Sequence, residues 1–311
     1  MTTERSGAAQ NSGSLDLTIA LPVYNEVEAV RTTLLAVKGV ADGMGVSYEI
    51  LAVNDGSSDG TSEILDDLVS ELDGVLRVIR HPYNLGNGAS VKTAIRAAQG
   101  EVLVLMDADG QHNPADIPRL YERVGPYDLV VAARTRQTKG DWPRRFANLA
   151  FEALASYLTD FKIKDLTSGF RAFKTELVLG FVHLLPNKFS YPTTTTMAFI
   201  KAGHTVDFVT VEAAKREGKS KVRPARDGIR FLTIIGKMVV LFEPLRVFLP
   251  AAVIMFLMAV ASFVFTIVDE SRLHVPNSAV FLAVSAVIVF LIGMVAEQVA
   301  ELRISLGSRR H

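Results

Sequence analysis

The chain has 311 residues, 49% of them hydrophobic, and its 33 basic and 33 acidic side chains cancel to a formal net charge of zero. This balance gives no sign of a nucleic-acid partner. The absence of cysteine excludes disulfides, thiolate metal sites and a cysteine nucleophile. The length suffices for one large domain or two with a sizeable core.

Residues 1–16 are mostly small and polar and lack the apolar core of a signal peptide, so we expect a disordered tail. Beyond them, short apolar runs alternate with amphipathic stretches, which predicts a mostly parallel α/β sheet. The predicted strands are Leu17–Val23, Glu49–Val53, Leu76–Arg80, Val102–Met106, Leu129–Ala133 and Val206–Val211. The predicted helices are Glu28–Val40, Thr61–Leu72, Ala89–Gln99, Asp116–Val124 and Trp142–Leu158.

Polar clusters follow three of these strands, at the carboxyl ends where α/β sheets bind ligands. Tyr24 could stack on a nucleobase, Glu26 could accept a hydrogen bond from a ribose, and Asp55 could contact either. The residues after Asp55 can equally be read as a well-capped strand-to-helix loop.

Asp107 and Asp109 follow a buried strand and stand one residue apart. Hard cations such as Mg²⁺ or Mn²⁺ prefer oxygen ligands from one or two carboxylates plus phosphates. An isolated Asp-x-Asp triplet also arises in ordinary acidic turns, but its place at a strand end favours a metal site. Four of the six histidines, at positions 81, 112, 183 and 204, show no metal-ligand spacing, so we expect structural roles for them.

Two uncharged segments, Val247–Val268 and Ser278–Ala296, are each about as long as the 20 apolar residues that cross a bilayer core. We expect a transmembrane hairpin over residues 247–300; the alternative is a pair of buried core helices. Arg246 precedes the hairpin, and Arg303, Arg309 and Arg310 follow it. The positive-inside bias therefore predicts a multi-pass protein of the inner (plasma) membrane, with its main domain and the tail 301–311 in the cytoplasm.

The region 222–246 joins the domain to this hairpin. Arg223, Arg226, Arg230 and Lys237 fall near one face of a helix that is otherwise largely apolar. Such a pattern predicts an amphipathic helix at the headgroup boundary of an anionic membrane, or else an ordinary solvated face.

Several motifs together resemble the inverting family 2 glycosyltransferases, which have the Rossmann-like GT-A fold. They are Pro22-x-Tyr24-Asn25-Glu26, the Asp55–Thr61 loop, Asn84-Leu85-Gly86-x-Gly88 and Asp107-Ala108-Asp109. The match spans residues 17–221 and implies a GT-A catalytic domain with Mg²⁺ or Mn²⁺ on Asp107, Asp109 and Gln111. The implied contacts to the nucleotide sugar are Pro22, Tyr24, Glu26, Val53, Asp55, Asn84, Asp107, Ala108 and Asp109.

Ser168–Phe173 and Arg216–Lys221 look like segments of the polyprenyl-phosphate glycosyltransferases, the dolichyl-phosphate mannose synthase group. In that group a basic loop closes over the donor and acceptor phosphates; here Arg216 stands one residue closer to Gly218, so the registration is open. Two terminal spans fit its bacterial two-span type. The implied catalytic residues are Asp107, Asp109, Arg134, Arg216, Ser220 and Lys221, and the implied acceptor-phosphate ligands are Arg134, Arg144, Arg145, Ser220 and Lys221.

The expected reaction is transfer of one hexose, with inversion, from a nucleotide-diphosphate sugar to polyprenyl (undecaprenyl) phosphate. UDP-glucose is favoured by the resemblance, while GDP-mannose and a UDP-N-acetylhexosamine remain open. A lipid phosphate is already an anionic nucleophile, so positioning and charge neutralisation matter more than a strong base. The oligomeric state is left open, with a homo-oligomer as one possibility.

Three other classes of protein are alternatives to a polyprenyl-phosphate glycosyltransferase. A processive polysaccharide synthase would carry a Gln-x-x-Arg-Trp motif, which does not occur here. A sugar nucleotidyltransferase usually opens with a glycine-rich nucleotide loop, which is missing after Leu17–Val23. An inactive membrane scaffold would have no physical need for Asp55, the acidic triplet and the basic residues together.

Overall fold

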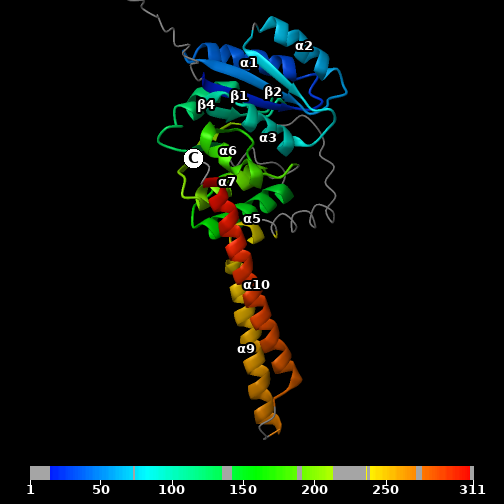
Figure 1. Cartoon of the computed structure of the whole chain (residues 1–311), viewed down its shortest axis with the longest axis vertical. Helices are drawn as coiled ribbons and strands as arrows, with labels where there is room; N and C mark the ends of the chain where they lie inside the picture. The colour runs from blue at the N-terminus through cyan, green and yellow to red at the C-terminus, as the bar shows by residue number, and fades with distance from the viewer. Residues whose placement is uncertain are drawn as a thin grey trace, which may run out of the picture.

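The computed structural model describes residues 15–72, 74–134, 142–187, 191–212, 236, 239–270 and 275–308. A rounded α/β domain carries a long pair of helices that projects from one end (Figure 1). The predictions for residues 213–235, which include most of the expected interface helix, lie outside these ranges.

The domain is built on one seven-stranded sheet with the order β3-β2-β1-β4-β6-β5-β7. Strand β6 runs antiparallel to both β4 and β5, and the other pairings are parallel. The strands are β1 (Leu15–Val23), β2 (Tyr48–Asn54), β3 (Leu76–Arg80), β4 (Gly100–Leu105), β5 (Leu129–Arg134), β6 (Arg171–Lys174) and β7 (Val206–Val211).

Helices cover both faces of the sheet, because its central strands are apolar on both sides. One core lies under α1, α2 and α4, and the other under α3, α5, α6 and α7. The domain helices are α1 (Val30–Asp42), α2 (Thr61–Glu71), α3 (Asn87–Ala97), α4 (Ile117–Tyr121), α5 (Trp142–Thr159), α6 (Thr175–Phe181) and α7 (Tyr191–Lys201), with 3₁₀ turns η1 (Pro114–Asp116) and η3 (Val182–Leu184).

The predicted mostly parallel α/β architecture is confirmed, with small differences at the edges of elements. Strand β1 begins at Leu15, two residues inside the expected tail. Residues 114–121 form a 3₁₀ turn followed by a short helix rather than one continuous helix, and prolines stand at the start of each. The apolar pattern does not predict β6, a four-residue strand whose first residue is arginine.

The projecting hairpin consists of α9 (Leu245–Glu270) and α10 (Asn277–Ser308). Both contain stretches long and apolar enough to cross a membrane, Leu245–Val268 and Asn277–Ser305. Only 11% and 17% of their most apolar windows are buried, which excludes the alternative of soluble core helices. Large side chains such as Phe265 and Phe281 point outward, so the hairpin has the surface of a membrane anchor.

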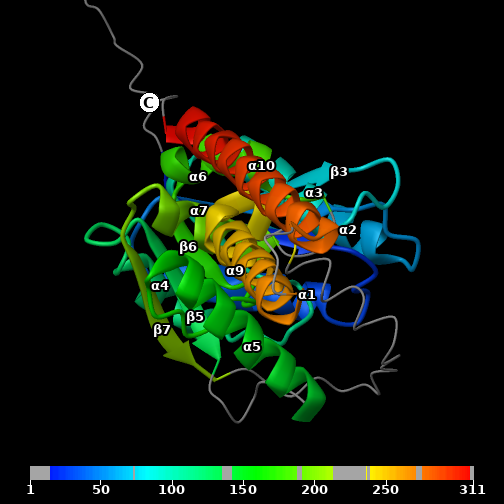
Figure 2. The same ribbon diagram turned by 90° about the horizontal axis from the view of Figure 1, so that it is seen from below.

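The two helices lie side by side along most of their length (Figures 1 and 2). Small residues recur every seventh position along the buried face of α10, at Ala279, Ala286, Gly293 and Ala300. Two buried alanines on α9, Ala252 and Ala259, keep the same spacing. Small residues let helix backbones approach closely, which is the usual basis of helix association in membranes.

Polar contacts attach the hairpin to the domain. Arg246 pairs with Asp160 after α5, and Glu243 pairs with Lys201 of α7. The N–H of Leu245 at the start of α9 donates to the Glu297 carboxylate of α10 at 3.0 Å. The two ion pairs therefore tie the base of the hairpin to the domain, and the Leu245–Glu297 hydrogen bond joins its two helices.

The packing of the hairpin predicts that one Gly→Ala substitution in a helix destabilises the protein instead of stabilising it. Gly→Ala in a helix normally stabilises by about 1 kcal/mol, but a Cβ at Gly293 would lie 2.6 Å from the Phe248 Cβ. We expect Gly293→Ala to lower the thermal unfolding midpoint in detergent. Gly39→Ala in α1, where nothing lies within 4 Å, is the control and should not lower it. A midpoint raised by Gly293→Ala would contradict the tight packing.

Candidate active site

The loops after β1, β2 and β4 lie together at the carboxyl end of the sheet, because these strands are parallel neighbours in register. The first two loops are joined by side chains. The Asn25 N–H donates to Ser57 Oγ at 3.0 Å, and the Glu26 N–H donates to Thr61 Oγ1 at 3.0 Å. Asn25 adopts a left-handed conformation with φ 55°. Tyr24 lies exposed beside this joint, while Pro22 and Val53 are register partners in the strands below it.

Asp55 is buried, and its carboxylate is fully engaged by the protein. It pairs with His81 Nδ1 at 2.6 Å and accepts from the N–H groups of Leu85 and Gly86 at 3.0 and 2.8 Å. His81 Nε2 in turn contacts Thr93 Oγ1 at 2.9 Å. Asp55 therefore fixes the loop that carries the exposed Asn84, whereas its direct contact with a nucleotide stays a prediction.

The acidic triplet follows β4 after one residue, Met106. Ala108 is buried, and Asp107 and Asp109 are partly exposed. The carboxylate of Asp109 accepts from the Gln111 N–H at 3.1 Å and from Gln111 Nε2 at 2.6 Å. Gln111 thus holds Asp109 in place. Because its Nε2 is engaged, the side chain of Gln111 could bind a metal only through Oε1.

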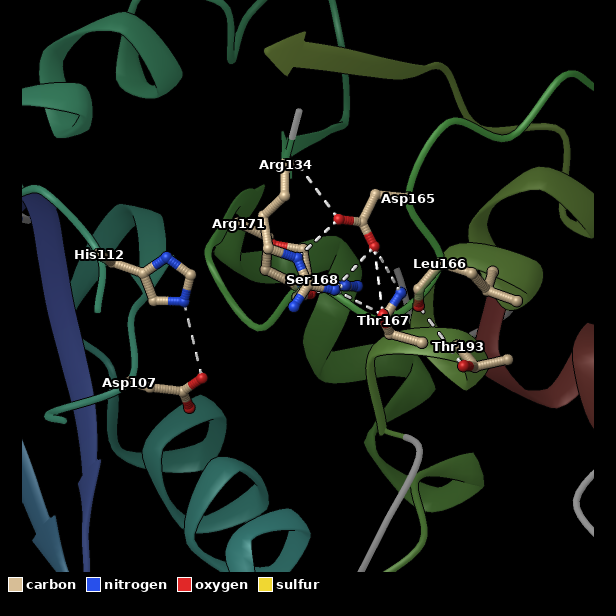
Figure 3. Close-up of polar contacts among 9 residues, drawn as sticks. All are labelled: Asp107, His112, Arg134, Asp165, Leu166, Thr167, Ser168, Arg171 and Thr193. Carbon is tan, nitrogen blue, oxygen red and sulfur yellow. Dashed lines mark hydrogen bonds and ion pairs between the residues drawn. The ribbon is translucent and has the colours of Figure 1, made fainter. Parts of the chain in front are cut away.

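Asp107 sits against the loop that leads into β6. A Cβ at Gly169 would lie 2.7 Å from Asp107 Oδ2, so only glycine permits this approach. The Tyr191 hydroxyl donates to the Gly169 carbonyl at 3.3 Å, and burial, together with the charge of Asp107, raises the pKa of Tyr191. On the other side, His112 Nε2 lies 3.7 Å from Asp107 Oδ2 (Figure 3).

Arg134 at the end of β5 forms a two-point ion pair with the buried Asp165, with Nε–Oδ2 and Nη2–Oδ1 distances of 2.9 and 3.2 Å. It also donates to Thr167 Oγ1 at 2.6 Å (Figure 3). Burial alone would raise the pKa of Asp165, but the hydrogen bonds and charge of Arg134 outweigh it and hold that pKa below its usual value. Arg134 is therefore already paired, and a substrate phosphate would have to share it with Asp165.

Arg171, the first residue of β6, is fully buried and is held by neutral acceptors. Its guanidinium donates to the carbonyl oxygens of Ser168 and Pro192, and to the hydroxyls of Thr195 and Thr196. Burial lowers its pKa to about 10, so it remains charged at neutral pH. The guanidinium joins the Gly169 loop to the threonine-rich start of α7.

Several predicted phosphate ligands cannot be placed by side chain. Arg144 and Arg145 belong to α5, whose described features there are limited to the backbone. Arg216, Ser220 and Lys221 lie outside the described residues. In turn, the prediction named no role for Asp165, Arg171 or Tyr191, although the Ser168–Phe173 resemblance contains Arg171 and lies three residues beyond Asp165.

A divalent cation fits the donor set at the acidic triplet only if the substrate completes its coordination. Asp107 and Asp109 offer hard carboxylate oxygens at one strand end. Within the described part of the chain, no group of three or more His, Asp or Glu side chains could hold a metal alone. Mg²⁺ and Mn²⁺ are commonly bound by one or two carboxylates plus substrate phosphates and water, which matches this arrangement.

A mixed, mostly parallel sheet with an acidic triplet after its central strand β4 is the arrangement of GT-A glycosyltransferases. Residues 18–179, more than half of the chain, match the family model "Glycosyl transferase family 2". The protein belongs to this family. Residues 243–302 match a second model, "GtrB C-terminal hairpin", which coincides with α9 and α10.

Curated relatives align with about two thirds of the chain. An undecaprenyl-phosphate 4-deoxy-4-formamido-L-arabinose transferase of Edwardsiella ictaluri is 27% identical over 206 residues, covering 66% of this chain and 62% of the relative. The protein of the same description from Pseudomonas fluorescens is 29% identical over 225 residues, covering 68% and 61%. The alignment thus spans less than two thirds of these relatives' length.

Solved structures confirm the fold. Glucosyl-3-phosphoglycerate synthase from Mycobacterium tuberculosis, in complex with Mn²⁺ and UDP-glucose, superposes with a TM-score of 0.54 at 18% identity. The superposition covers 76% of this chain and 84% of that one. At this identity the likeness concerns the GT-A fold alone.

The Arg134–Asp165 pair predicts a pH-dependent effect on stability. Because the pKa of Asp165 is depressed in the folded state, its ionised form stabilises the fold above about pH 4, and this contribution disappears as pH falls through the folded pKa. Asp165→Asn should lower the free energy of unfolding by about 2 kcal/mol at pH 7. Denaturant titrations should show this difference shrinking toward pH 3. Asp67→Asn, at a well-exposed carboxylate, is the control, and an equally large change there would contradict the assignment.

Proposed function

We propose that this protein transfers a single hexosyl group from a nucleotide-diphosphate sugar to a polyprenyl phosphate, with inversion at the anomeric carbon and a divalent cation at Asp107 and Asp109. Undecaprenyl phosphate is the favoured acceptor and UDP-glucose the favoured donor. The observation that carries the proposal is the acidic triplet of a family 2 domain in the same chain as an exposed apolar hairpin.

The lipid acceptor is supported by the relatives and by the hairpin. Relatives that share two thirds of the chain are described as undecaprenyl-phosphate sugar transferases. Helices α9 and α10 would place the active site next to the bilayer surface, where the phosphate of such a lipid lies. Arg246 near the start of α9 and Arg303 near the end of α10 both lie at the end of the hairpin that contacts the domain. The proposed location is therefore the inner (plasma) membrane, with the catalytic domain in the cytoplasm.

The donor is the less constrained partner. A neighbour in fold binds UDP-glucose with Mn²⁺, which favours UDP-glucose here by analogy only. The relatives' descriptions name 4-deoxy-4-formamido-L-arabinose, so a UDP-linked form of that sugar joins GDP-mannose and UDP-N-acetylhexosamines as alternatives.

The proposed step needs no strong general base, because the attacking lipid phosphate is already an anion. An oxygen of the lipid phosphate forms the bond to the anomeric carbon, while the bond from that carbon to the donor diphosphate breaks and its electron pair leaves with the diphosphate. A bound Mg²⁺ or Mn²⁺ supplies charge neutralisation on the departing diphosphate. Asp107 and Asp109 hold that charge in position, and Gln111 orients Asp109.

Positive side chains would orient the acceptor phosphate. Arg134 lies at the carboxyl end of β5, at the same end of the sheet as the triplet. The Nε and Nη2 atoms of its guanidinium bind Asp165. We propose that it shares this charge with the acceptor phosphate, together with Arg144, Arg145, Arg216, Ser220 and Lys221. Arginine and lysine are the usual protein ligands of phosphate.

The test uses the purified full-length protein in detergent or vesicles, with undecaprenyl phosphate, Mn²⁺ and a panel of radiolabelled sugar nucleotides. We expect one lipid-linked monosaccharide, formed from one donor and abolished by EDTA. Asp109→Ala should reduce the rate at least about a hundredfold, because an electrostatic contact made in the transition state is lost.

The control variant Asp67→Ala removes a well-exposed carboxylate and should leave the rate unchanged. A polymer as product would identify a processive synthase instead. Absence of any lipid product with every donor would indicate an inactive scaffold. Full activity of Asp109→Ala would overturn the metal assignment.

A further inference from the structure

His112 occupies a buried position beside the acidic triplet. Its side chain is 8% exposed, against 34% for Asp107. The ring packs on Phe170, with centroids 5.2 Å apart and planes tilted by 50°. Phe170 is itself fully buried, so this packing fixes the direction in which the imidazole points.

The two ring nitrogens of His112 have different surroundings. Nε2 faces Asp107 Oδ2 at 3.7 Å (Figure 3). Nδ1 is buried and has no hydrogen-bond partner among the described residues. An ionised carboxylate offers only acceptors, so Nε2 can bind Oδ2 only as an N–H donor.

Asp107 Oδ2 is confined from two directions. The glycine at position 169 lies so close that a Cβ there would stand 2.7 Å from this oxygen. His112 closes the other direction. In the described part of the chain Oδ1 has no hydrogen-bond partner, so it is the oxygen left available to a ligand.

We propose that His112 is a positioning residue for Asp107, with its Nε2–H fixing Oδ2 so that the carboxylate is presented to a divalent cation. The inference rests on the proposed function, because it presupposes a cation at the triplet. A distance of 3.7 Å is too long for a full hydrogen bond, and such contacts often shorten only when the ligand binds. Hydrogen bonds to metal-binding carboxylates orient them, and losing one typically weakens metal affinity by about 10- to 100-fold.

Three substitutions distinguish the role of His112 Nε2 from that of Nδ1. His112→Phe keeps the ring packing on Phe170 and removes both nitrogens. His112→Gln places an amide N–H near the position of Nε2, whereas His112→Asn places one near Nδ1. If His112 acts through Nε2, only the glutamine variant should rescue cation binding.

The measurement is the Mn²⁺ dissociation constant in the presence of UDP, by electron paramagnetic resonance on the purified full-length protein. We expect His112→Phe to weaken Mn²⁺ binding about tenfold or more, His112→Asn to weaken it similarly, and His112→Gln to stay within about threefold of the wild type. Thermal unfolding of each variant reports whether the domain is intact.

A matched control is available at His204. Its Nδ1 lies 3.5 Å from Asp128 Oδ2, and its ring packs against Phe181 and Phe199. His204→Phe removes a similar histidine–aspartate contact from the start of β5, at the opposite end of that strand from Arg134. It should leave Mn²⁺ affinity unchanged.

The outcomes are separable. Wild-type affinity in His112→Phe, or rescue by asparagine and not glutamine, would overturn the inference while leaving the proposed reaction intact. If the phenylalanine variant does not fold, the contrast between glutamine and asparagine still decides. A wild-type protein that binds no Mn²⁺ in the presence of UDP would overturn both the metal-dependent part of the proposed function and this inference.

Discussion

The site depends on a buried arginine that has no carboxylate in hydrogen-bond contact among the residues that the structure describes. Arg171 is fully buried, and its guanidinium donates to the carbonyls of Ser168 and Pro192 and to the hydroxyls of Thr195 and Thr196. Removing a charge from water costs several kcal/mol, and here that cost is offset by satisfied neutral acceptors rather than by an ion pair. The consequence is geometric: one side chain binds the loop before β6 to the start of α7, and so holds Gly169 against Asp107.

The mixed sheet explains how that loop reaches the acidic triplet. Strand β6 lies between β4 and β5 and runs antiparallel to both, so the chain enters it from the carboxyl ends of its neighbours. The residues just before β6 therefore come to the end of the sheet where Asp107 follows β4 and Arg134 ends β5. At this position Asp165 pairs with Arg134, and Gly169 lies close to Asp107. A parallel strand in the same place would enter from the opposite edge of the sheet.

The membrane anchor is joined to the domain by contacts that use charged and backbone groups together. Arg246 and Glu243 pair with Asp160 and Lys201 of the domain. Within the hairpin, Glu297 of α10 accepts the N–H of Leu245 at the start of α9. His183 Nε2 lies 3.2 Å from the Arg303 carbonyl near the end of α10. Small residues at seven-residue spacing keep the two helices close. The helix pair is thus tied to the domain at several points.

The sequence alone determined the sheet class, the six longer strands, the two spans and the family, because apolar periodicity and local motifs are written in contiguous residues. Tertiary structure decided the rest. The four-residue β6 carries no periodic signal, and the sequence assigned no role to Arg171, whose acceptors from α7 come together only in the fold. For Asp55, only the fold showed the contacts to His81, Leu85 and Gly86. His112 reads as structural until β4 and Phe170 bring it beside Asp107. In each case the partner is remote in sequence or on another element, and burial, which selects the hydrogen-bond partners, exists only once the chain has folded.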